Sequence, residues 1–500
     1  MSETTAELLD CSLVRIDPAW ALRIPSSLAL RRLVLPFAAN DEFVFVACAN
    51  TQDTAALEAV ERFVGKPIQA EAADVDSLRQ VLQRVYGLQT AVSGEGRSPL
   101  MRMEFRQGSE LDPNDAVALC DELLFAALVR EASDIHIDPC PDNIMVRLRV
   151  DGELEKYRTL PSVVLNGLIS RYKVLAGMDI AEKRAPQDGA FTHRFGAASM
   201  KIDIRVATLP TKHGERMTLR LLATQTETLT IERLGMLPHD QTLFEQAVSL
   251  PHGMILLTGP TGSGKTTTLY AALRKLTAAQ VGNVITIEDP IEYAIPGVAQ
   301  VEVDSADKVS FSRALRSVLR HDPDVVMIGE IRDFETADVA IKASLTGHLV
   351  FSTLHTNSAA GVVTRLADMG VQRYLIAATL RLAVSQRLVR RLCSKCRRAR
   401  PMTATEAAAL RRIEDVGRTV YDAVGCKFCT NRGLAGRLGL FELLPCDENL
   451  ARLIALGASE PDLIAAAKQA GAGLLLDDAA QKVFAGQTTL PETLSAVTAW

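Results

Sequence analysis

A glycine-rich segment that ends in lysine and threonine carries the clearest chemistry in this 500-residue sequence. It consists of Gly259, Pro260, Thr261, Gly262, Ser263, Gly264, Lys265, Thr266 and Thr267. An apolar run precedes it and a helical pattern follows, which is the strand, loop and helix context of a phosphate-binding loop. Backbone N–H groups of such a loop surround phosphate oxygens, its lysine reaches the β and γ phosphates, and the Thr266 hydroxyl ligates Mg²⁺. The segment therefore predicts a nucleotide site with Mg²⁺.

Acidic residues follow two further apolar runs and are expected to serve the same site. The first run leads into Glu288 and Glu292, and the second, at 325–328, leads into Glu330. Acids at strand ends beside a phosphate-binding loop hold Mg²⁺ through water and orient the attacking water. Gly329 stands where most P-loop enzymes carry an aspartate, so Glu330 is assigned to the metal side. The water-activating base is then Glu288 or Glu292, and an exposed strand-end charge is the alternative for each acid.

A histidine lies at the end of another apolar run, at 349–351. His355 is placed to sense the γ phosphate or to relay the nucleotide state to a neighbouring subunit. A purely structural histidine is the competing interpretation, and it is favoured for His348.

Four of the nine cysteines form two CxxC pairs. Cys393 with Cys396, and Cys426 with Cys429, can place four thiolates tetrahedrally around Zn²⁺. Closed coordination by four cysteines leaves no open position, so the zinc is expected to be structural. Redox cysteines and unlinked thiols are the alternatives.

A basic run flanks the first cysteine pair. Its members are Arg387, Arg390, Arg391, Lys395, Arg397, Arg398 and Arg400. Such a run can contact acidic partner surfaces or anionic lipid. A solvated rim of the zinc site is the favoured interpretation, so no site is assigned to it.

Changes of pattern along the chain predict the elements that position these residues. A helix at 115–131 precedes alternating strands at 135–138, 144–150, 152–156, 201–208 and 216–222, which indicate an α+β unit. From about 229, strand, loop and helix repeat, as in a doubly wound parallel sheet that binds its ligand at the carboxyl ends of the strands. The predicted segments are 1–88, 89–111 as linker, 112–228, 229–390, 391–446 with the cysteines, and 447–500 as a helical part.

Composition limits the classes of function. The net charge of −5 offers no global basic field, so no nucleic acid is expected as partner. The amino-terminal residues lack a basic leader, and no apolar run approaches the roughly 18 residues of a spanning helix. A cytoplasmic protein is therefore expected.

These signatures, in this order, resemble the secretion traffic ATPases. The shared segments are 259–266, 286–292, 324–333 and 348–357 in the motor, 132–137, 186–189 and 209–216 in that family's second N-terminal domain, and the cysteine pairs with 436–442 in its metal-binding insert. Within the family, 361–370 looks more like the type II secretion ATPases than the pilus assembly ones. Residues 1–88 resemble the type II amino-terminal domain only loosely.

The resemblance implies an α/β fold: a RecA-like P-loop motor domain with an inserted four-cysteine zinc subdomain, preceded by two smaller α+β domains, the second PAS-like. It implies a homo-hexamer that binds ATP between the motor and its own second N-terminal domain. Arg205 and Arg220 match two family arginines that act on the phosphates. Ordinary strand-surface charges are the alternative for both.

The function implied is hydrolysis of Mg-ATP that drives type II secretion through pseudopilus assembly. Residues 1–88 would dock on the cytoplasmic domain of an inner-membrane platform protein, which would attach the ATPase peripherally to that membrane. Three alternatives stay open: a type IV pilus assembly ATPase, a nucleic-acid motor, and a nucleotide-binding scaffold with little turnover.

Overall fold

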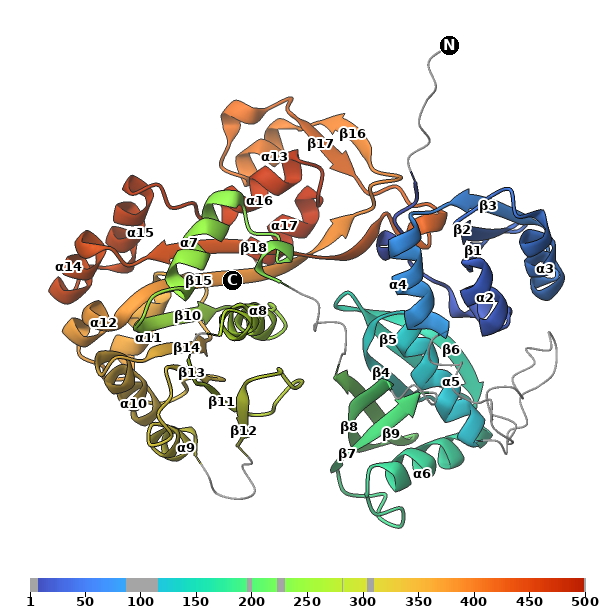
Figure 1. Cartoon of the computed structure of the whole chain (residues 1–500), viewed down its shortest axis with the longest axis horizontal. Coiled ribbons are helices and arrows are strands. Elements are labelled where there is room, and N and C mark those ends of the chain that lie inside the picture. Colours follow the sequence, from blue (N-terminus) through green and yellow to red (C-terminus); the bar gives the residue numbers. More distant parts are fainter. Residues whose placement is uncertain are drawn as a thin grey trace. The chain divides into compact units, whose positions relative to one another are not determined.

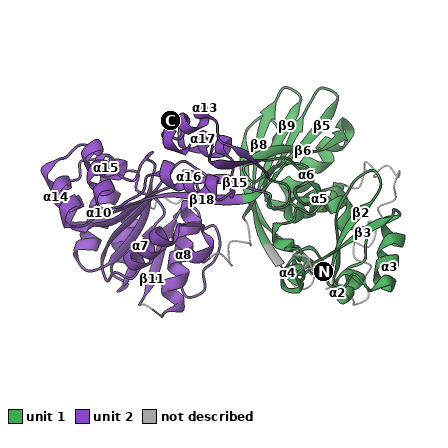
Figure 2. Cartoon of the chain, turned by 90° about the horizontal axis from the view of Figure 1, so that it is seen from above, with its two compact units in different colours: residues 1–223, 393–397, 423–436 green, residues 224–392, 398–422, 437–500 purple. Residues whose placement is uncertain are grey.

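A computed structural model describes residues 8–86, 116–195, 200–222, 230–280, 282–303 and 310–498. The chain forms two compact units (Figure 2). Unit 1 comprises residues 1–223, 393–397 and 423–436, and unit 2 comprises 224–392, 398–422 and 437–500. The predicted linker at 89–111 and the predicted boundary at 228 lie outside the described residues.

Unit 1 begins with a small three-stranded domain (Figure 1). β1 (Val34–Ala39) pairs antiparallel with β2 (Val44–Cys48), which pairs parallel with β3 (Ile68–Ala72). Its helices are α1 (Pro18–Ala21), α2 (Ser26–Arg32), α3 (Thr54–Val64) and α4 (Val75–Tyr86). α4 buries Leu78, Val81, Leu82 and Val85, the helical spacing that directs one face to a core.

The second domain of unit 1 is an antiparallel sheet in the order β6-β5-β4-β9-β8-β7. Its strands are β4 (Ala132–Pro139), β5 (Asn143–Val150), β6 (Glu153–Pro161), β7 (Gln187–Phe195), β8 (Met200–Thr211) and β9 (Gly214–Leu222), and its helices are α5 (Ala116–Val129) and α6 (Leu165–Leu175). Alternate residues of β5 and β9 are buried, so one face of the sheet packs on the core. The sequence did not predict β7 or α6, because β7 is a mostly polar edge strand and α6 contains a glycine.

Unit 2 is built on a seven-stranded sheet in the order β12-β11-β13-β14-β10-β15-β18. The strands are β10 (Gly253–Thr258), β11 (Val284–Glu288), β12 (Ala299–Glu302), β13 (Val325–Ile328), β14 (Leu349–Leu354), β15 (Leu380–Leu392) and β18 (Leu434–Pro445). The pairs from β12 to β15 are parallel. The predicted doubly wound parallel sheet is therefore present.

Helices cover both faces of this sheet. α7 (Pro238–Val248) and α8 (Lys265–Ala278) share a core with Ile255 and Leu257 of β10. Met254 and Leu256 face the opposite core. Further helices of unit 2 contribute to that core: α9 (Phe311–Val318), α10 (Phe334–Leu345), α11 (Gly361–Asp368), α12 (Arg373–Thr379), α14 (Glu448–Leu456) and α15 (Glu460–Gln469). The alternation along β10 explains its continuous apolar sequence, since both faces are buried.

The carboxyl-terminal helices α16 (Leu475–Phe484) and α17 (Leu490–Thr498) are tied to the last strands of the sheet. Asp478 accepts a hydrogen bond from Phe441 N at 2.8 Å, and Lys482 donates to the Gly439 carbonyl at 2.7 Å. Glu442 accepts from Leu475 N at 3.2 Å. A small pair, β16 (Arg398–Pro401) and β17 (Thr419–Asp422), lies with α13 (Ala404–Ala409). β18 belongs to the motor sheet although it falls inside the range 391–446 predicted as an insert.

Candidate active site and metal centre

The glycine-rich loop lies between β10 and α8, as the sequence predicts. β10 ends at Thr258, and α8 begins at Lys265. Gly262 and Gly264 have φ of 80° and 89°, a region that favours glycine. At Gly259 a Cβ would lie 2.4 Å from the Gln386 carbonyl oxygen, so only glycine fits. The loop therefore exposes its backbone N–H groups before the start of a helix, which is the geometry that binds phosphate.

Lys265 is buried inside this loop. Its Nζ donates to the carbonyl oxygens of Gly259 and Pro260 at 2.8 and 3.1 Å. Burial lowers the pKa of Lys265 to about 8, and the nearby Arg387 acts in the same direction, against the attraction of Glu330. The Ser263 hydroxyl is buried and has no protein partner. A phosphate oxygen bound in the loop could accept hydrogen bonds from the Lys265 ammonium and the Ser263 hydroxyl.

Glu330 and His355 meet at the carboxyl end of the sheet. His355 Nε2 lies 3.3 Å from Glu330 Oε2, and Arg332 forms an ion pair with the other oxygen. Burial opposes ionisation of Glu330, but Arg332 and His355 outweigh it and hold the pKa of that carboxyl below its usual value. The carboxylate is thus kept charged, as a metal-side ligand requires.

Glu288 lies in a closed hydrogen-bonded network. Its side chain is 2% exposed. One carboxylate oxygen accepts from Thr286 at 2.6 Å and from Gln300 at 3.0 Å, and the other accepts from the Tyr270 hydroxyl. Glu292 is exposed, and its backbone N donates to the Tyr270 hydroxyl at 3.3 Å. The two candidate bases therefore stand in very different surroundings.

Sequence reasoning missed Arg387, which it placed in a solvated basic rim. The residue follows the part of β15 that pairs with β10, and it is only 5% exposed. Its guanidinium donates to the carbonyls of Asn357 and Gln386, each at 3.0 Å, while its Nε has no partner. The cation lies beside the glycine-rich loop, because a Cβ on Gly259 would approach it to 3.0 Å. Its position in an arginine-rich run hid this burial.

Other members of the basic run are paired with acids. Arg390 forms a bidentate contact with Glu492, and Arg400 bonds Glu406 and Asp422. The expectation of a solvated rim was therefore wrong for three of its members. Arg387 is buried, and Arg390 and Arg400 are bonded to carboxylates.

The segment after His355 is tied to the loop strand. Thr258 Oγ1 accepts from Thr356 N at 2.6 Å, and Glu442 accepts from Ala359 N at 2.8 Å. Thr356 and Ala359 therefore link the segment after His355 to β10 and to β18.

Arg205 and Arg220 lie directly opposite each other on β8 and β9 of unit 1. Arg220 donates to Asp134 Oδ1 at 3.0 Å, yet its side chain is 66% exposed. Asp134 also lies 3.7 Å from Arg149, so one buried acid orients two arginines. The pairing was not visible in the sequence, where Asp134 is more than 80 residues from Arg220. The predicted action of Arg205 and Arg220 on phosphate stays a prediction.

The four paired cysteines come together in unit 1, with their sulfur atoms within 4.8 Å of one another. The Cys393–Cys426, Cys396–Cys429 and Cys426–Cys429 separations are each 3.8 Å. Four sulfurs about 2.3 Å from a zinc ion would be about 3.8 Å apart, so the cluster fits Zn²⁺. Backbone N–H groups of Gly425, Cys426 and Gly433 also point at sulfur. A hydrogen bond from Cys393, aided by the amides of Cys426 and Gly433, lowers the pKa of Cys429 to about 4.

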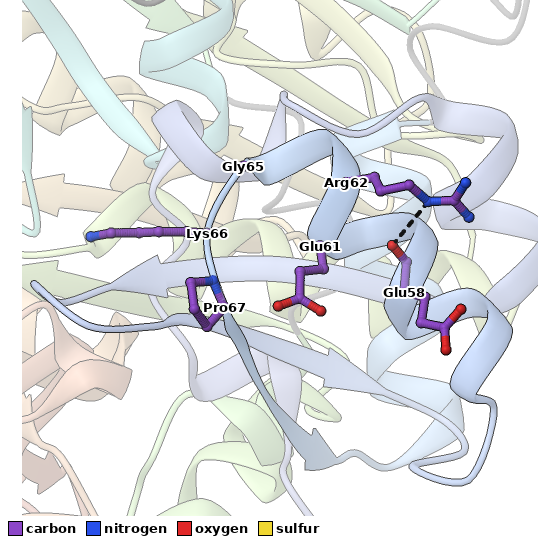
Figure 3. A pocket seen from close by; sticks show the side chains of 6 residues that line it. All are labelled: Glu58, Glu61, Arg62, Gly65, Lys66 and Pro67. Carbon is purple, nitrogen blue, oxygen red and sulfur yellow. Dashed lines mark hydrogen bonds between the residues drawn. The ribbon is translucent and has the colours of Figure 1, made fainter.

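A shallow pocket in the first domain offers no comparable chemistry (Figure 3). Glu58, Glu61, Arg62, Gly65, Lys66 and Pro67 line it. The Arg62 Nε donates to the Glu58 carbonyl at 3.4 Å. Its mixed charges do not converge on one point, so it is not a candidate site.

Comparison with known proteins decides the family. Residues 110–495 match the family described as "Type II/IV secretion system protein". The chain belongs to this family. Residues 6–92 of this secretion-family chain also match the MshEN domain. The predicted resemblance and the predicted fold are thus confirmed, and the chain is an ATPase of the secretion family.

Three relatives illustrate the match. The type II secretion system protein E of Pseudomonas aeruginosa is 40% identical over 502 residues, with 98% of each chain covered. The type IV pilus assembly ATPase PilB of Myxococcus xanthus is 36% identical over 492 residues, 96% of this chain and 87% of its own. A crystal structure of the pilus retraction motor PilT with bound ADP is 26% identical, with a TM-score of 0.52 over 77% of this chain and 96% of that one.

Proposed function

We propose that this chain is the ATPase of a type II secretion machine and works as a hexamer on an inner-membrane platform. The observation that carries the proposal is a charged Glu330, held by His355 and Arg332. The same chain has a buried phosphate-loop lysine, and it is 40% identical to a type II secretion protein over 98% of both lengths. ATP and Mg²⁺ are the proposed substrate and ion, with Zn²⁺ structural at the four cysteines.

Attachment to the membrane is proposed to run through a partner. Among the helices that the structure describes, none is long and apolar enough to cross a bilayer. Residues 1–88 are the proposed docking module for the cytoplasmic domain of the platform protein, and the ATPase itself is proposed to act from the cytoplasm.

The surroundings of the two candidate bases favour Glu292 as the residue that activates water. Both carboxylate oxygens of Glu288 are bonded to Tyr270, Thr286 or Gln300, so Glu288 is proposed to fix the position of the acid-rich segment, residues 288–292. Glu330 is proposed to hold Mg²⁺ through water, and His355 to report the nucleotide state. Arg205 and Arg220 would stabilise transition-state charge when domain closure brings them to the phosphates.

A pair of substitutions tests this division of roles. Glu292→Gln removes a base while keeping size, and we expect kcat for ATP hydrolysis to fall about 10²-fold or more. Glu288→Gln keeps most acceptors of the network, and we expect a loss of less than about tenfold. Steady-state phosphate release measures both, with thermal unfolding as the control for folding. The reverse ranking would make Glu288 the base.

The secretion role is tested in the host. Deletion of the gene, complemented by wild type or by Lys265→Ala, is scored in parallel for extracellular enzymes and for surface pili. Loss of secreted enzymes with pili intact, not rescued by Lys265→Ala, is expected. Loss of pili alone would assign the chain to pilus assembly, a role that the match to PilB also allows.

A further inference from the structure

The second cysteine pair lies on a turn that touches the first domain of the chain. We call residues 423–436 the knuckle; they carry Cys426 and Cys429 and belong to unit 1. Phe428 stacks on Phe37 of β1, with ring centres 5.7 Å apart and an interplanar angle of 14°. The Phe428 carbonyl accepts a hydrogen bond from Arg15 N at 3.0 Å. A residue between two metal ligands is therefore packed against the amino-terminal domain.

The neighbouring lysine adds a charged contact to the same domain. Lys427 forms an ion pair with Glu71 of β3, and its Nζ lies 4.1 Å from the ring centre of Phe45 on β2. Glu71 is 30% and Lys427 22% exposed, so the pair is partly shielded from water. Aromatic stacking, cation–π attraction and an ion pair thus converge on two consecutive residues.

The knuckle also bonds the second domain through two acids of β6 and its preceding turn. Arg432 forms an ion pair with Glu155, and Gly436 N donates to Asp151 at 3.0 Å. Both acids also bind Arg15 of the first domain, Glu155 at 3.2 Å. Asp151 and Glu155 are therefore shared between the knuckle and the first domain.

The knuckle backbone needs a constraint to hold this shape. Thr430 and Asn431 have φ of 50° and 61°, and neither is glycine. A Cβ on Gly425 would lie 2.5 Å from the Asn431 carbonyl oxygen. Such conformations persist where surrounding bonds fix them, and four sulfurs bound to one ion would provide that constraint.

We infer that the metal-loaded knuckle is the receptor for the chain's own amino-terminal domain, which it fastens to the second domain by Phe428, Lys427 and Arg432. Zinc is then a condition for docking of residues 8–86, and loss of the ion releases that domain. The inference goes beyond the proposed function and does not depend on ATP hydrolysis.

Carbodiimide crosslinking of the full chain tests the inference, because the reagent joins a lysine to a carboxylate only when they are in direct contact. The Lys427–Glu71 pair should give a crosslinked peptide in the monomer band of the zinc-loaded protein. Lys275 and Glu245, which lie 2.8 Å apart in unit 2, provide an internal control.

Two changes should each reduce the Lys427–Glu71 product at least about fivefold while leaving the Lys275–Glu245 product unchanged: removal of zinc by a chelator, and Phe428→Ala, which keeps all four cysteines. Lys468→Glu, at an exposed helix position of unit 2, should change neither product. An undiminished Lys427–Glu71 product after both treatments would overturn the inference. A product found only in a dimer band would overturn it too, since the occupant would then be a second copy.

Discussion

The carboxyl edge of the motor sheet and the strands β8 and β9 of the second domain, which carry Arg205 and Arg220, differ in how far their charged side chains are buried. In the motor, Lys265 and Arg387 are buried, and Glu330 is held by Arg332 and His355. On the second domain, Arg220 is 66% exposed and is anchored by a single acid, Asp134. Lys265 and Arg387 are thus enclosed by protein, whereas the Arg220 guanidinium is open to solvent.

This difference separates two tasks. Buried groups such as Lys265 and Arg387 stabilise charge without reorganising, so they suit nucleotide binding. An exposed guanidinium can be brought in by domain movement and withdrawn again, so it suits timing. Substitutions on the motor edge should therefore affect binding and chemistry together, and those on the second domain should affect turnover with little change in binding.

The largest effect is expected for Lys265→Ala. The change removes the cation that we propose to reach the β and γ phosphates, so ATPase activity should fall more than about 10³-fold and nucleotide binding should weaken with it. Phosphate release and titration with a fluorescent ATP analogue measure both. Retained nucleotide binding with lost turnover would show that Lys265, like the exposed Arg220, acts on the rate of hydrolysis rather than on binding.

Arg220→Gln should reduce kcat about 10²- to 10³-fold while the affinity for ATP changes little. Asp134→Asn should cost less, about tenfold, because it only loosens the arginine. The same two assays apply, and Arg147→Gln, on β5 of the same sheet, is the matched control. Equal losses in affinity and in kcat would show that Arg220 binds the ground state.

The pH dependence of binding should show the buried lysine. Burial lowers the pKa of Lys265 from 10.5 to about 8, so the ammonium loses its proton as pH rises through that value. Phosphate needs the charged form, and affinity for the ATP analogue should fall about tenfold between pH 7 and pH 9. Lys265→Arg keeps its charge over this range and should lose the dependence. A flat wild-type profile would contradict a lowered pKa of Lys265.

The smallest effect is expected for Tyr270→Phe. The change deletes one donor to Glu288 and leaves the ring against Tyr293, 4.6 Å between centres. We expect kcat to fall about fivefold with KM within about twofold, because the acid-rich segment loses a tether rather than a catalytic group. Steady-state kinetics checks it, and Tyr374→Phe, an exposed position, is the control.

Much of the fold could be predicted from apolar runs in the sequence, because the motor strands are buried on both faces. Each of these runs also ends at a glycine-rich, acidic or histidine-containing motif. β10, β11, β13 and β14 lie where apolar runs predicted them. β7 escaped because an edge strand with a half-exposed, polar sequence has no apolar alternation to read. The order of strands in the sheet, which brings β14 between β13 and β10, is a property of packing that no single segment encodes.

The candidate site divides in the same way. The glycine-rich loop and the two cysteine pairs could be recognised from spacing, because the residues of each motif lie close together in the sequence. Tyr270, Gln300, Asp134 and Arg387 could not, because each acts through a partner distant in sequence or hidden in a charged run. The proposed preference for Glu292 over Glu288 likewise rests on burial, which the sequence EDPIE does not reveal.

The carboxylate of Glu442 has a practical consequence for shortening the chain. It receives Ala359 N from the segment after His355 and Leu475 N from the start of α16, and burial raises its pKa. A truncation after residue 474 would remove one hydrogen-bond donor from the half-buried Glu442 and leave Phe441 N without its acceptor Asp478. α16 and α17 are therefore not expendable. Their removal would disturb Glu442 and, through it, the segment that follows His355.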